Sequence, residues 1–271
     1  MVTKPNFEVI VFISFIHGGS SLYAEEAIIL AAGLGTRMSD YIRDVPKPLV
    51  KILDVPLIMY AIAGFLNIGV RNFYIVVNQY NLKAISNIMG SLNVNVKLIV
   101  NNSPIRGNGY SLILGMKHVK NELFYISMSD HIYAPSIFKK LLYNADASII
   151  VTVDSNPRYI NIDEATKVMT QHGKVIDIGK EINEYTHVDI GLFIMKKKLY
   201  NDFKLFSENN YKIELSKLIK YSINKKHIVT ALDIHGAPWM DVDTANDLIR
   251  ATNLAQSFIE DVKKIITSSS K

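Results

Sequence analysis

Short apolar runs alternate with longer amphipathic stretches through the first half of the chain. Residues 27–32 and 73–79 are runs with the length and residue types of buried strands, and residues 94–100 have the pattern of a third strand. Between them, residues 56–67 and 82–89 place apolar side chains at helical spacing. This alternation predicts a Rossmann-like α/β fold, in which a mixed, mainly parallel sheet has helices on both faces. Ligands of such sheets bind at the carboxyl ends of the strands.

The second half of the chain carries pairs of strands with fewer helices. Gly173 lies between two short strand patterns, which indicates a hairpin. We interpret residues 147–236 as a subdomain at the edge of the sheet that does not fold independently. Thr244 and Asp247 then mark the start of a last helix, which we expect to run to about residue 266.

Both ends of the chain are expected to lie outside the main domain, which spans residues 25–265. An apolar stretch after Lys4 is similar to a weak secretory signal, but Glu8 and the shortness of the stretch count against it. We therefore expect residues 1–24 to be an N-terminal extension, with an extra edge strand as the alternative. Residues 266–271 are expected to form a disordered tail.

The composition excludes several classes of function. With 271 residues, 49% of them hydrophobic, the chain can bury a sizeable core. It has no cysteine, which excludes disulfides, thiolate metal sites and cysteine nucleophiles. The formal charge is +5, but the basic residues are scattered without interleaved aromatic residues, so nucleic-acid binding is not favoured. No apolar segment reaches the roughly twenty residues that span a bilayer. We expect a soluble, cytoplasmic protein.

The loop after the first strand pattern has the composition of a phosphate-binding loop. Gly33 and Gly35 can take backbone angles that other residues resist, and they leave room for a ligand. Arg37 adds a bidentate cation, and Lys47 stands between two prolines that stiffen the local backbone. The dinucleotide fingerprint is excluded because Met38 replaces its third glycine, and the Walker GK[ST] sequence is absent.

This stretch, AAGLGTR followed by PKPL, resembles the signature of the nucleotidyltransferases that activate sugar phosphates. The resemblance covers about residues 26–255 and implies the nucleotide-diphospho-sugar transferase fold. It also implies that the nucleotide contacts the first loop and the proline-flanked lysine, namely Ala31, Ala32, Gly33, Leu34, Gly35, Thr36, Arg37 and Lys47.

A second loop and helix start lie within residues 101–115. Asn108 offers donors and acceptors to a base edge, Gly109 permits close backbone approach, and Ser111 is placed to cap the next helix. In the resembled family this position lies beside the base, which implies that Asn108, Gly109 and Ser111 contact the nucleotide. An ordinary turn and cap is the alternative, because clusters of glycine and asparagine are common in turns.

Three aspartates are the candidate metal ligands. Asp130 ends a strand pattern, where a ligand to Mg²⁺ is expected, and it is counted as a nucleotide-binding residue because the substrate phosphates complete the ligands of that ion. Asp241 and Asp243 lie two residues apart, so both face the same side of an extended strand. We expect one of this pair to join Asp130 and favour Asp243; a helix-cap role without metal is the alternative. His131 is assigned no catalytic role.

The second lobe contains the candidates for acceptor binding. By resemblance to a lysine at the matching place in the family, Lys180 is expected to hold the phosphate of the acceptor. Glu181 and Asp189 are expected to bond the hydroxyl groups of a polyol. Ordinary surface ion pairs are the alternative for all three residues.

Within the family, RGNGYSL, SMSDHIY, VDIGLFIM and WMDVDT resemble the cytidylyltransferase domain that acts on L-myo-inositol-1-phosphate. In several microbes that domain is fused to a membrane phosphatidyltransferase-like domain. The present sequence ends after the first domain, so a separate membrane enzyme is expected to receive CDP-inositol. The sequence also departs from the fused proteins before Glu25 and in a longer loop between Arg37 and Pro46.

The resemblance implies direct, in-line transfer from CTP to inositol-1-phosphate, with release of pyrophosphate. Arg37 then steadies the pyrophosphate, Lys47 stabilises charge at the α-phosphate, and Lys180 holds the acceptor. The same chemistry on glucose-1-phosphate with UTP or dTTP, or on phosphocholine with CTP, is an alternative. A sensor without turnover is a further alternative. The sequence leaves the oligomeric state open.

Overall fold

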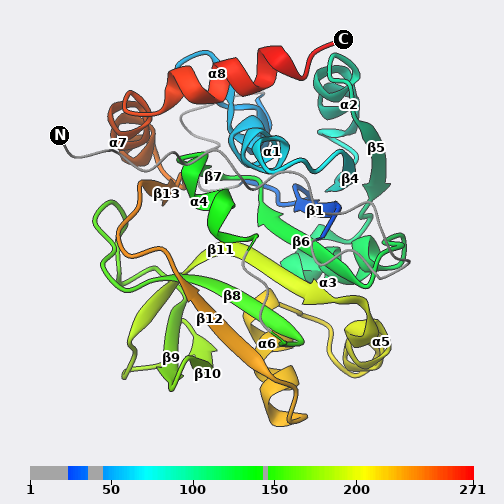
Figure 1. Cartoon of the computed structure of the whole chain (residues 1–271). Coiled ribbons are helices and arrows are strands. Elements are labelled where there is room, and N and C mark those ends of the chain that lie inside the picture. The colour runs from blue at the N-terminus through cyan, green and yellow to red at the C-terminus, as the bar shows by residue number, and fades with distance from the viewer. Residues whose placement is uncertain (1–23, 36–44, 143–145) are drawn as a thin grey trace, which may run out of the picture.

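The apolar runs of the first half form neighbouring parallel strands in one mixed sheet. The computed structural model describes residues 24–35, 45–142 and 146–271. In this part of the chain the strand order is β5-β4-β1-β6-β11-β8-β12-β10-β9 (Figure 1). The bounds are β1 (Glu26–Leu30), β4 (Asn72–Val77), β5 (Asn95–Val100), β6 (Leu123–Met128), β8 (Ile149–Asp154), β9 (Lys167–Gln171), β10 (Lys174–Gly179), β11 (His187–Lys196) and β12 (Val229–Asp233).

The strands in the first half of the sheet are parallel, so their carboxyl ends lie at the same edge. β4 and β6 flank β1, and β5 pairs with the outer side of β4, all in parallel. Every residue of β1 is buried, as the unbroken apolar run predicts for a strand that is covered on both faces.

The long strand β11 joins this half to the second lobe. It is antiparallel to β6 on one side and to β8 on the other, so chain direction changes at this strand. The predicted hairpin is present: β9 and β10 pair in antiparallel fashion around His172 and Gly173, whose φ angles are 51° and 75°. Positive φ at both positions matches the turn type that joins twisted strands.

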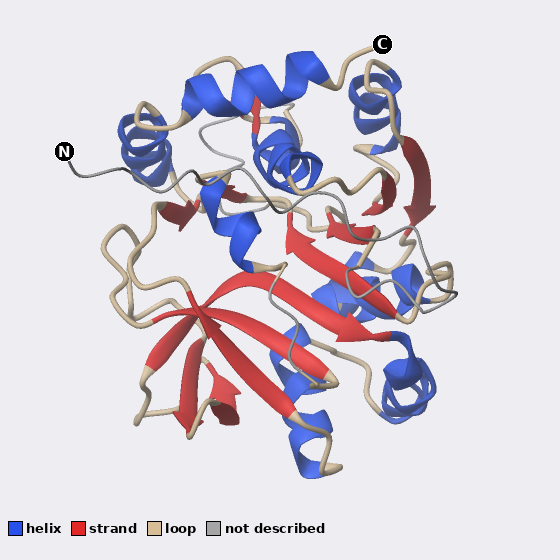
Figure 2. Cartoon of the chain, viewed as in Figure 1, coloured by secondary structure: helices blue, strands red, loops and turns tan. Residues whose placement is uncertain are grey.

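Helices cover both faces of the sheet, as Figure 2 shows. The core of one face includes side chains of α1, α2, α4, α7 and α8, and the core of the other includes side chains of α3, α5 and α6. The bounds are α1 (Leu57–Asn67), α2 (Leu82–Gly90), α3 (Asn108–Met116), α4 (Ser136–Lys140), α5 (Tyr200–Asn209), α6 (Leu215–Asn224), α7 (Ala245–Ala255) and α8 (Ile259–Ser268). Small strand pairs form from β2 (Lys51–Ile52) with β3 (Val55–Pro56) and from β7 (His131–Tyr133) with β13 (Trp239–Asp241).

The C-terminal region differs from the expectation in two ways. The last helix is two helices, α7 and α8, although the Thr244–Asp247 capping box starts α7 as predicted. The tail is ordered rather than disordered: helix α8 runs to Ser268, and Ser270 forms a β-bridge with Leu92. The physical reason is that α8 packs against α1, which brings the tail beside a turn whose backbone groups it can pair. Residues 1–23 lie outside the described residues, and so does most of the expected extension.

Candidate active site

The loop after β1 is held by two buried asparagines that follow β4. Asn81 Nδ2 donates to the carbonyl oxygen of Ala31 at 2.7 Å, and Asn78 Nδ2 donates to that of Ala32 at 3.1 Å. The Asn78 side chain also accepts from the backbone N–H of Asn81 at 3.0 Å, so the two residues fix each other. The loop backbone is therefore anchored on its inner side. Sequence reasoning gave these asparagines no role, although Asn78 lies near the end of the run 73–79 and Asn81 directly before the predicted helix 82–89.

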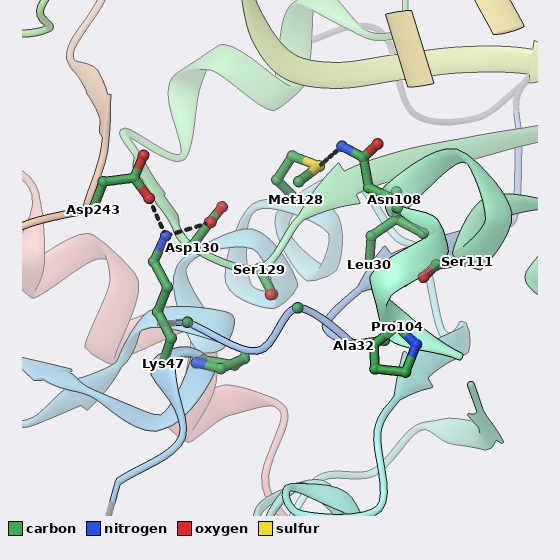
Figure 3. A pocket seen from close by; sticks show the side chains of 14 residues that line it. Leu30, Ala32, Lys47, Pro104, Asn108, Ser111, Met128, Ser129, Asp130 and Asp243 are labelled. Atoms are coloured by element: carbon green, nitrogen blue, oxygen red, sulfur yellow. Dashed lines mark hydrogen bonds and ion pairs between the residues drawn. The ribbon is translucent and has the colours of Figure 1, made fainter. Parts of the chain in front are cut away.

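Lys47 lies between two of the predicted metal ligands (Figure 3). Its Nζ donates to Asp130 Oδ2 at 2.6 Å and also to Asp243 Oδ1. The lysine side chain is only 10% exposed. Gly35, with φ of 64°, packs so closely that a Cβ there would lie 2.9 Å from Lys47 Cβ. The glycine of the first loop thus makes room for the lysine, whose prolines hold it in a short 3-10 turn, Lys47–Leu49.

The charges of this cluster reinforce one another. Burial acts to lower the pKa of Lys47, but the carboxylates of Asp130 and Asp243 outweigh it and raise that pKa above its ordinary value. Burial acts to raise the pKa of Asp130, but Lys47 and His131 hold it well below the ordinary range. The lysine is therefore charged and Asp130 ionised at neutral pH.

The two candidate aspartates of the last motif have different surroundings. Asp243 contacts Lys47 and lines both cavities described below, whereas Asp241 ends β13 opposite His131 and lines only the second cavity. Burial raises the pKa of Asp241, and the neighbouring carboxylates of Asp243 and Asp130 raise it further. The structure thus brings Asp243, rather than Asp241, into direct contact with the lysine.

His131, to which the sequence analysis assigned no catalytic role, contributes to the cluster through a contact with its neighbour Asp130. Its Nδ1 lies 2.7 Å from Asp130 Oδ1, and its ring stacks against that of Trp239 with centroids 6.0 Å apart. Trp239 Nε1 in turn donates to the buried Asp154 Oδ2 at 2.8 Å. Asp154, Trp239 and His131 therefore orient one side of Asp130. The available signal was the chain's one tryptophan, which lies two residues before Asp241.

A first cavity of about 250 Å³ opens at the carboxyl end of β1. Figure 3 shows the charged cluster at one end and Ser111 with Pro104 at the other. It is lined by Leu30, Ala32, Gly33, Gly35, Lys47, Pro48, Pro104, Gly107, Asn108, Ser111, Met128, Ser129, Asp130 and Asp243. A charged end and a neutral end suit a nucleotide triphosphate.

Other predicted nucleotide contacts lie elsewhere. Ala31 contacts the asparagine anchor, and Leu34 is 48% exposed and does not line the cavity. Gly109 packs against the chain before α6, where its N–H donates to Ile213 O at 3.0 Å. Its lack of a side chain serves this packing, since a Cβ there would lie 2.9 Å from Ile213 Cγ2. Thr36 and Arg37 lie outside the described residues.

Asn108 and Ser111 both line the cavity, but their roles in the helix differ from the expectation. Asn108 begins α3, and its Oδ1 accepts from the backbone N–H of Leu215 at 2.8 Å. The prediction that Ser111 caps this helix was wrong, because the helix starts three residues earlier and Gly107 is its N-cap. Ser111 Oγ instead accepts from Asn101 Nδ2 at 3.0 Å.

A second cavity of about 380 Å³ adjoins the first. Lys180 and Asp189 line it, as expected for acceptor residues, whereas Glu181 is exposed and lies outside its lining. Burial raises the pKa of Asp189 to about 7, although its Oδ1 accepts from the backbone N–H of Gly191 at 2.8 Å. The two cavities share Gly107, Asn108, Met128, Asp130 and Asp243.

Two further findings concern metal sites and membranes. Among residues 24–35, 45–142 and 146–271, no three His, Asp or Glu side chains are arranged to hold a metal ion by themselves. Asp130 and Asp243 nevertheless converge on one cation, and Mg²⁺ commonly takes one or two carboxylates with substrate phosphates completing its ligands. No helix in the described part of the chain has the length and apolar character to cross a bilayer.

Comparison with known proteins identifies the class. A family model described as nucleotidyl transferase matches residues 26–257. The chain therefore belongs to the nucleotidyl transferase family, which confirms the resemblance of the glycine loop and the proline-flanked lysine.

Two relatives are similar in sequence to most of this chain. The chain is 34% identical over 226 residues to a bifunctional IPC transferase and DIPP synthase of Archaeoglobus fulgidus, over 83% of this chain and 43% of the relative. It is 33% identical over 227 residues to the Aquifex aeolicus protein of the same name, over 84% of this chain and 51% of the relative. The chain thus spans about half the length of these relatives.

A solved structure supports the fold assignment. The inositol-1-phosphate CTP transferase from T. maritima is 28% identical, with a TM-score of 0.82 over 89% of this chain and 97% of that one. The predicted α/β fold of the nucleotide-diphospho-sugar transferases is confirmed.

Proposed function

We propose that this chain transfers a cytidylyl group from CTP to L-myo-inositol-1-phosphate, giving CDP-inositol and pyrophosphate. The observation that carries the proposal is the junction of two cavities at Asp130 and Asp243, with the Lys47 ammonium bonded to both carboxylates. A nucleotide in the first cavity and a phosphorylated acceptor in the second would bring their phosphates together at this junction. The likeness to inositol-1-phosphate CTP transferase supports these two substrates.

The proposed reaction is a direct in-line displacement. An oxygen of the inositol phosphate attacks the α-phosphorus of CTP, the bond from that phosphorus to the bridging oxygen breaks, and pyrophosphate leaves with the electron pair. Both reactants are anionic, so catalysis requires positioning and charge neutralisation. Lys47 supplies a positive charge at the junction, and Lys180 in the second cavity binds the acceptor phosphate. The role of Arg37 in steadying the leaving pyrophosphate remains a prediction.

The residues at the junction fit a divalent cation. Asp130 and Asp243 already share one cationic partner, and their oxygens are ligands that Mg²⁺ prefers. We propose that these two residues hold Mg²⁺, which when bound would neutralise charge on the phosphates. Asp189 in the second cavity is proposed to bond a ring hydroxyl of the inositol. We place the reaction in the cytoplasm, where CTP is available.

The test is pyrophosphate release by the purified protein with Mg²⁺, in which CTP, UTP, dTTP, ATP and GTP are each paired with inositol-1-phosphate and glucose-1-phosphate. We expect release with CTP and inositol-1-phosphate. Release only with another pair would keep the chemistry and overturn the proposed substrates, and absence of release in every combination would contradict the enzymatic proposal.

A variant of Lys47 tests the role of the junction. Lys47→Ala should lower kcat by about two to three orders of magnitude, because an oriented cation on developing charge contributes about 3 to 4 kcal/mol. Lys51→Ala is the matched control, since Lys51 is exposed on β2 four residues away. Near-normal turnover of a folded Lys47→Ala protein would overturn the assignment.

A further inference from the structure

The neutral end of the first cavity has a defined hydrogen-bonding character at Ser111. The charged groups Lys47, Asp130 and Asp243 occupy the opposite end (Figure 3). If the proposed function holds, the triphosphate lies toward those groups, and the base of the nucleotide reaches the end formed by Pro104 and Ser111. The groups on this wall then decide which base is accepted.

The buried Asn101 fixes the role of the Ser111 oxygen. Asn101 is 1% exposed, and its Oδ1 accepts from the backbone N–H of Ser103 at 2.8 Å. A backbone N–H can only donate, so the oxygen of this amide must face Ser103 and its NH₂ group must face Ser111. The amide therefore donates to Ser111 Oγ, at 3.0 Å.

The hydroxyl proton of Ser111 is left to point into the cavity. Within the part of the chain that the structure describes, no residue accepts a hydrogen bond from this hydroxyl. Ser111 is 4% exposed, so a proton without an acceptor costs more than an unused lone pair on the same oxygen. A ligand atom with a lone pair is consequently preferred at this position, and a ligand N–H is disfavoured.

Asn108, the other polar side chain expected beside the base, is already engaged. Its Oδ1 accepts from the backbone N–H of Leu215 at 2.8 Å, and its Nδ2 contacts Met128 Sδ at 3.9 Å. Its oxygen therefore serves to join α3 to the start of α6. The hydroxyl of Ser111, which Asn101 orients, is therefore the hydrogen-bonding group considered at this end of the cavity.

Pyrimidine bases differ at N3 in the property that Ser111 would detect. N3 of cytosine carries a lone pair, whereas N3 of uracil and thymine carries a hydrogen. We propose that the Ser111 hydroxyl donates to N3 of cytosine and that Ser111, oriented by Asn101, selects CTP over UTP. Uracil would place an N–H against the O–H, which leaves two buried donors without acceptors.

The experiment compares kcat/KM for CTP, UTP and 3-deazacytidine triphosphate, in which a C–H replaces N3. Ser111→Ala should lower the CTP-to-UTP ratio roughly 10- to 100-fold, as expected for one buried hydrogen bond and one removed clash. The unaltered protein should use 3-deazacytidine triphosphate less well than CTP by a similar factor, and Ser111→Ala should treat the two alike. Ser129→Ala, which removes another buried hydroxyl from the same cavity, should leave the ratio unchanged.

The outcomes separate this inference from the proposed function. If the unaltered protein prefers CTP but Ser111→Ala keeps the same CTP-to-UTP ratio, Ser111 is not the selecting residue. Equal losses with CTP and UTP would also overturn the inference, because they would indicate a contact to the O2 atom that both bases share. If the unaltered protein has no preference for CTP, the proposed function itself fails. Thermal melting of each variant establishes that the fold is retained.

Discussion

Asp189 provides the sharpest test of the electrostatics of the second cavity. Burial raises the pKa of this carboxyl from its ordinary value of 3.8 to about 7. The side chain lies on β11 and accepts from the backbone N–H of Gly191 at 2.8 Å. Asp189→Asn keeps this acceptor and the size of the side chain, while it removes the negative charge.

The direction in which pH changes the stability of the folded protein follows from proton linkage. A carboxyl whose pKa is higher in the folded state takes up a proton on folding, so stability falls as the pH rises from about 4 to about 7. Above that range the ionised Asp189 costs about 4 kcal/mol, since each pKa unit corresponds to about 1.4 kcal/mol. At pH 5 the cost is less than half as large, because the folded protein still carries the proton.

Asp189→Asn should therefore stabilise the protein, and more so at high pH. For a chain of this size we expect Tm to rise by about 8 °C at pH 8 and by about 3 °C at pH 5. The melts are made with EDTA and without nucleotide, so that no ligand changes the charge of the cavity. Asp163→Asn, at an exposed position, is the matched control and should leave Tm unchanged. A gain that is equal at both pH values, or no gain, would refute the reasoning.

Two further predictions concern the junction and the core. Lys47→Met should tighten the binding of Mn²⁺ in the absence of nucleotide by roughly tenfold or more, because Lys47 competes with a metal ion for Asp130 and Asp243. A Mn²⁺ titration followed by electron paramagnetic resonance measures this affinity, and an unchanged affinity would contradict the prediction. Gly64→Ala in α1 should cost about 1–3 kcal/mol of unfolding free energy, because its Cβ would lie 2.0 Å from the buried ring of Phe138. Urea unfolding tests this against Gly90→Ala in α2, where a Cβ meets nothing within 4 Å; equal stability of the two variants would count against the packing argument.

Local patterns in the sequence were sufficient to predict the strands of the first half, the start of α7 and the residues Lys47 and Asp130 of the charged cluster. The runs at residues 27–32 and 73–79 became buried strands because each has the length of one strand and lies between turn residues, whereas residues 94–100 became the edge strand β5, in which only Ile99 is buried. Lys47 and Asp130 were identifiable because each stands in a short motif directly after a strand or between prolines. The capping box at Thr244 was identifiable because it is a contact between residues three apart.

Contacts between distant segments were not readable from local patterns. Gly109 suggested close approach to a ligand, but it and Gly107 face the backbone of residues 213–214, where a Cβ at Gly107 would lie 2.3 Å from Ile213 O. The break between α7 and α8 and the order of the tail likewise depend on packing against α1 and on pairing with Leu92. Such outcomes are set by tertiary structure, which the spacing of residues in one segment does not specify.

The same tertiary contacts explain why the two cavities form one site. Their shared wall contains the start of α3, which the segment before α6 holds through bonds from Gly109 N to Ile213 O and from Leu215 N to Asn108 Oδ1. The opposite side of the junction is Asp130, which His131 and Lys47 orient from two directions. β11 runs antiparallel to β6 on one side and to β8 on the other, so this reversed strand separates the parallel half of the sheet from the second lobe. The loop proposed to bind the nucleotide and the lobe proposed to bind the acceptor lie on either side of one charged cluster, and Gly107 and Gly109 serve the packing of the shared wall.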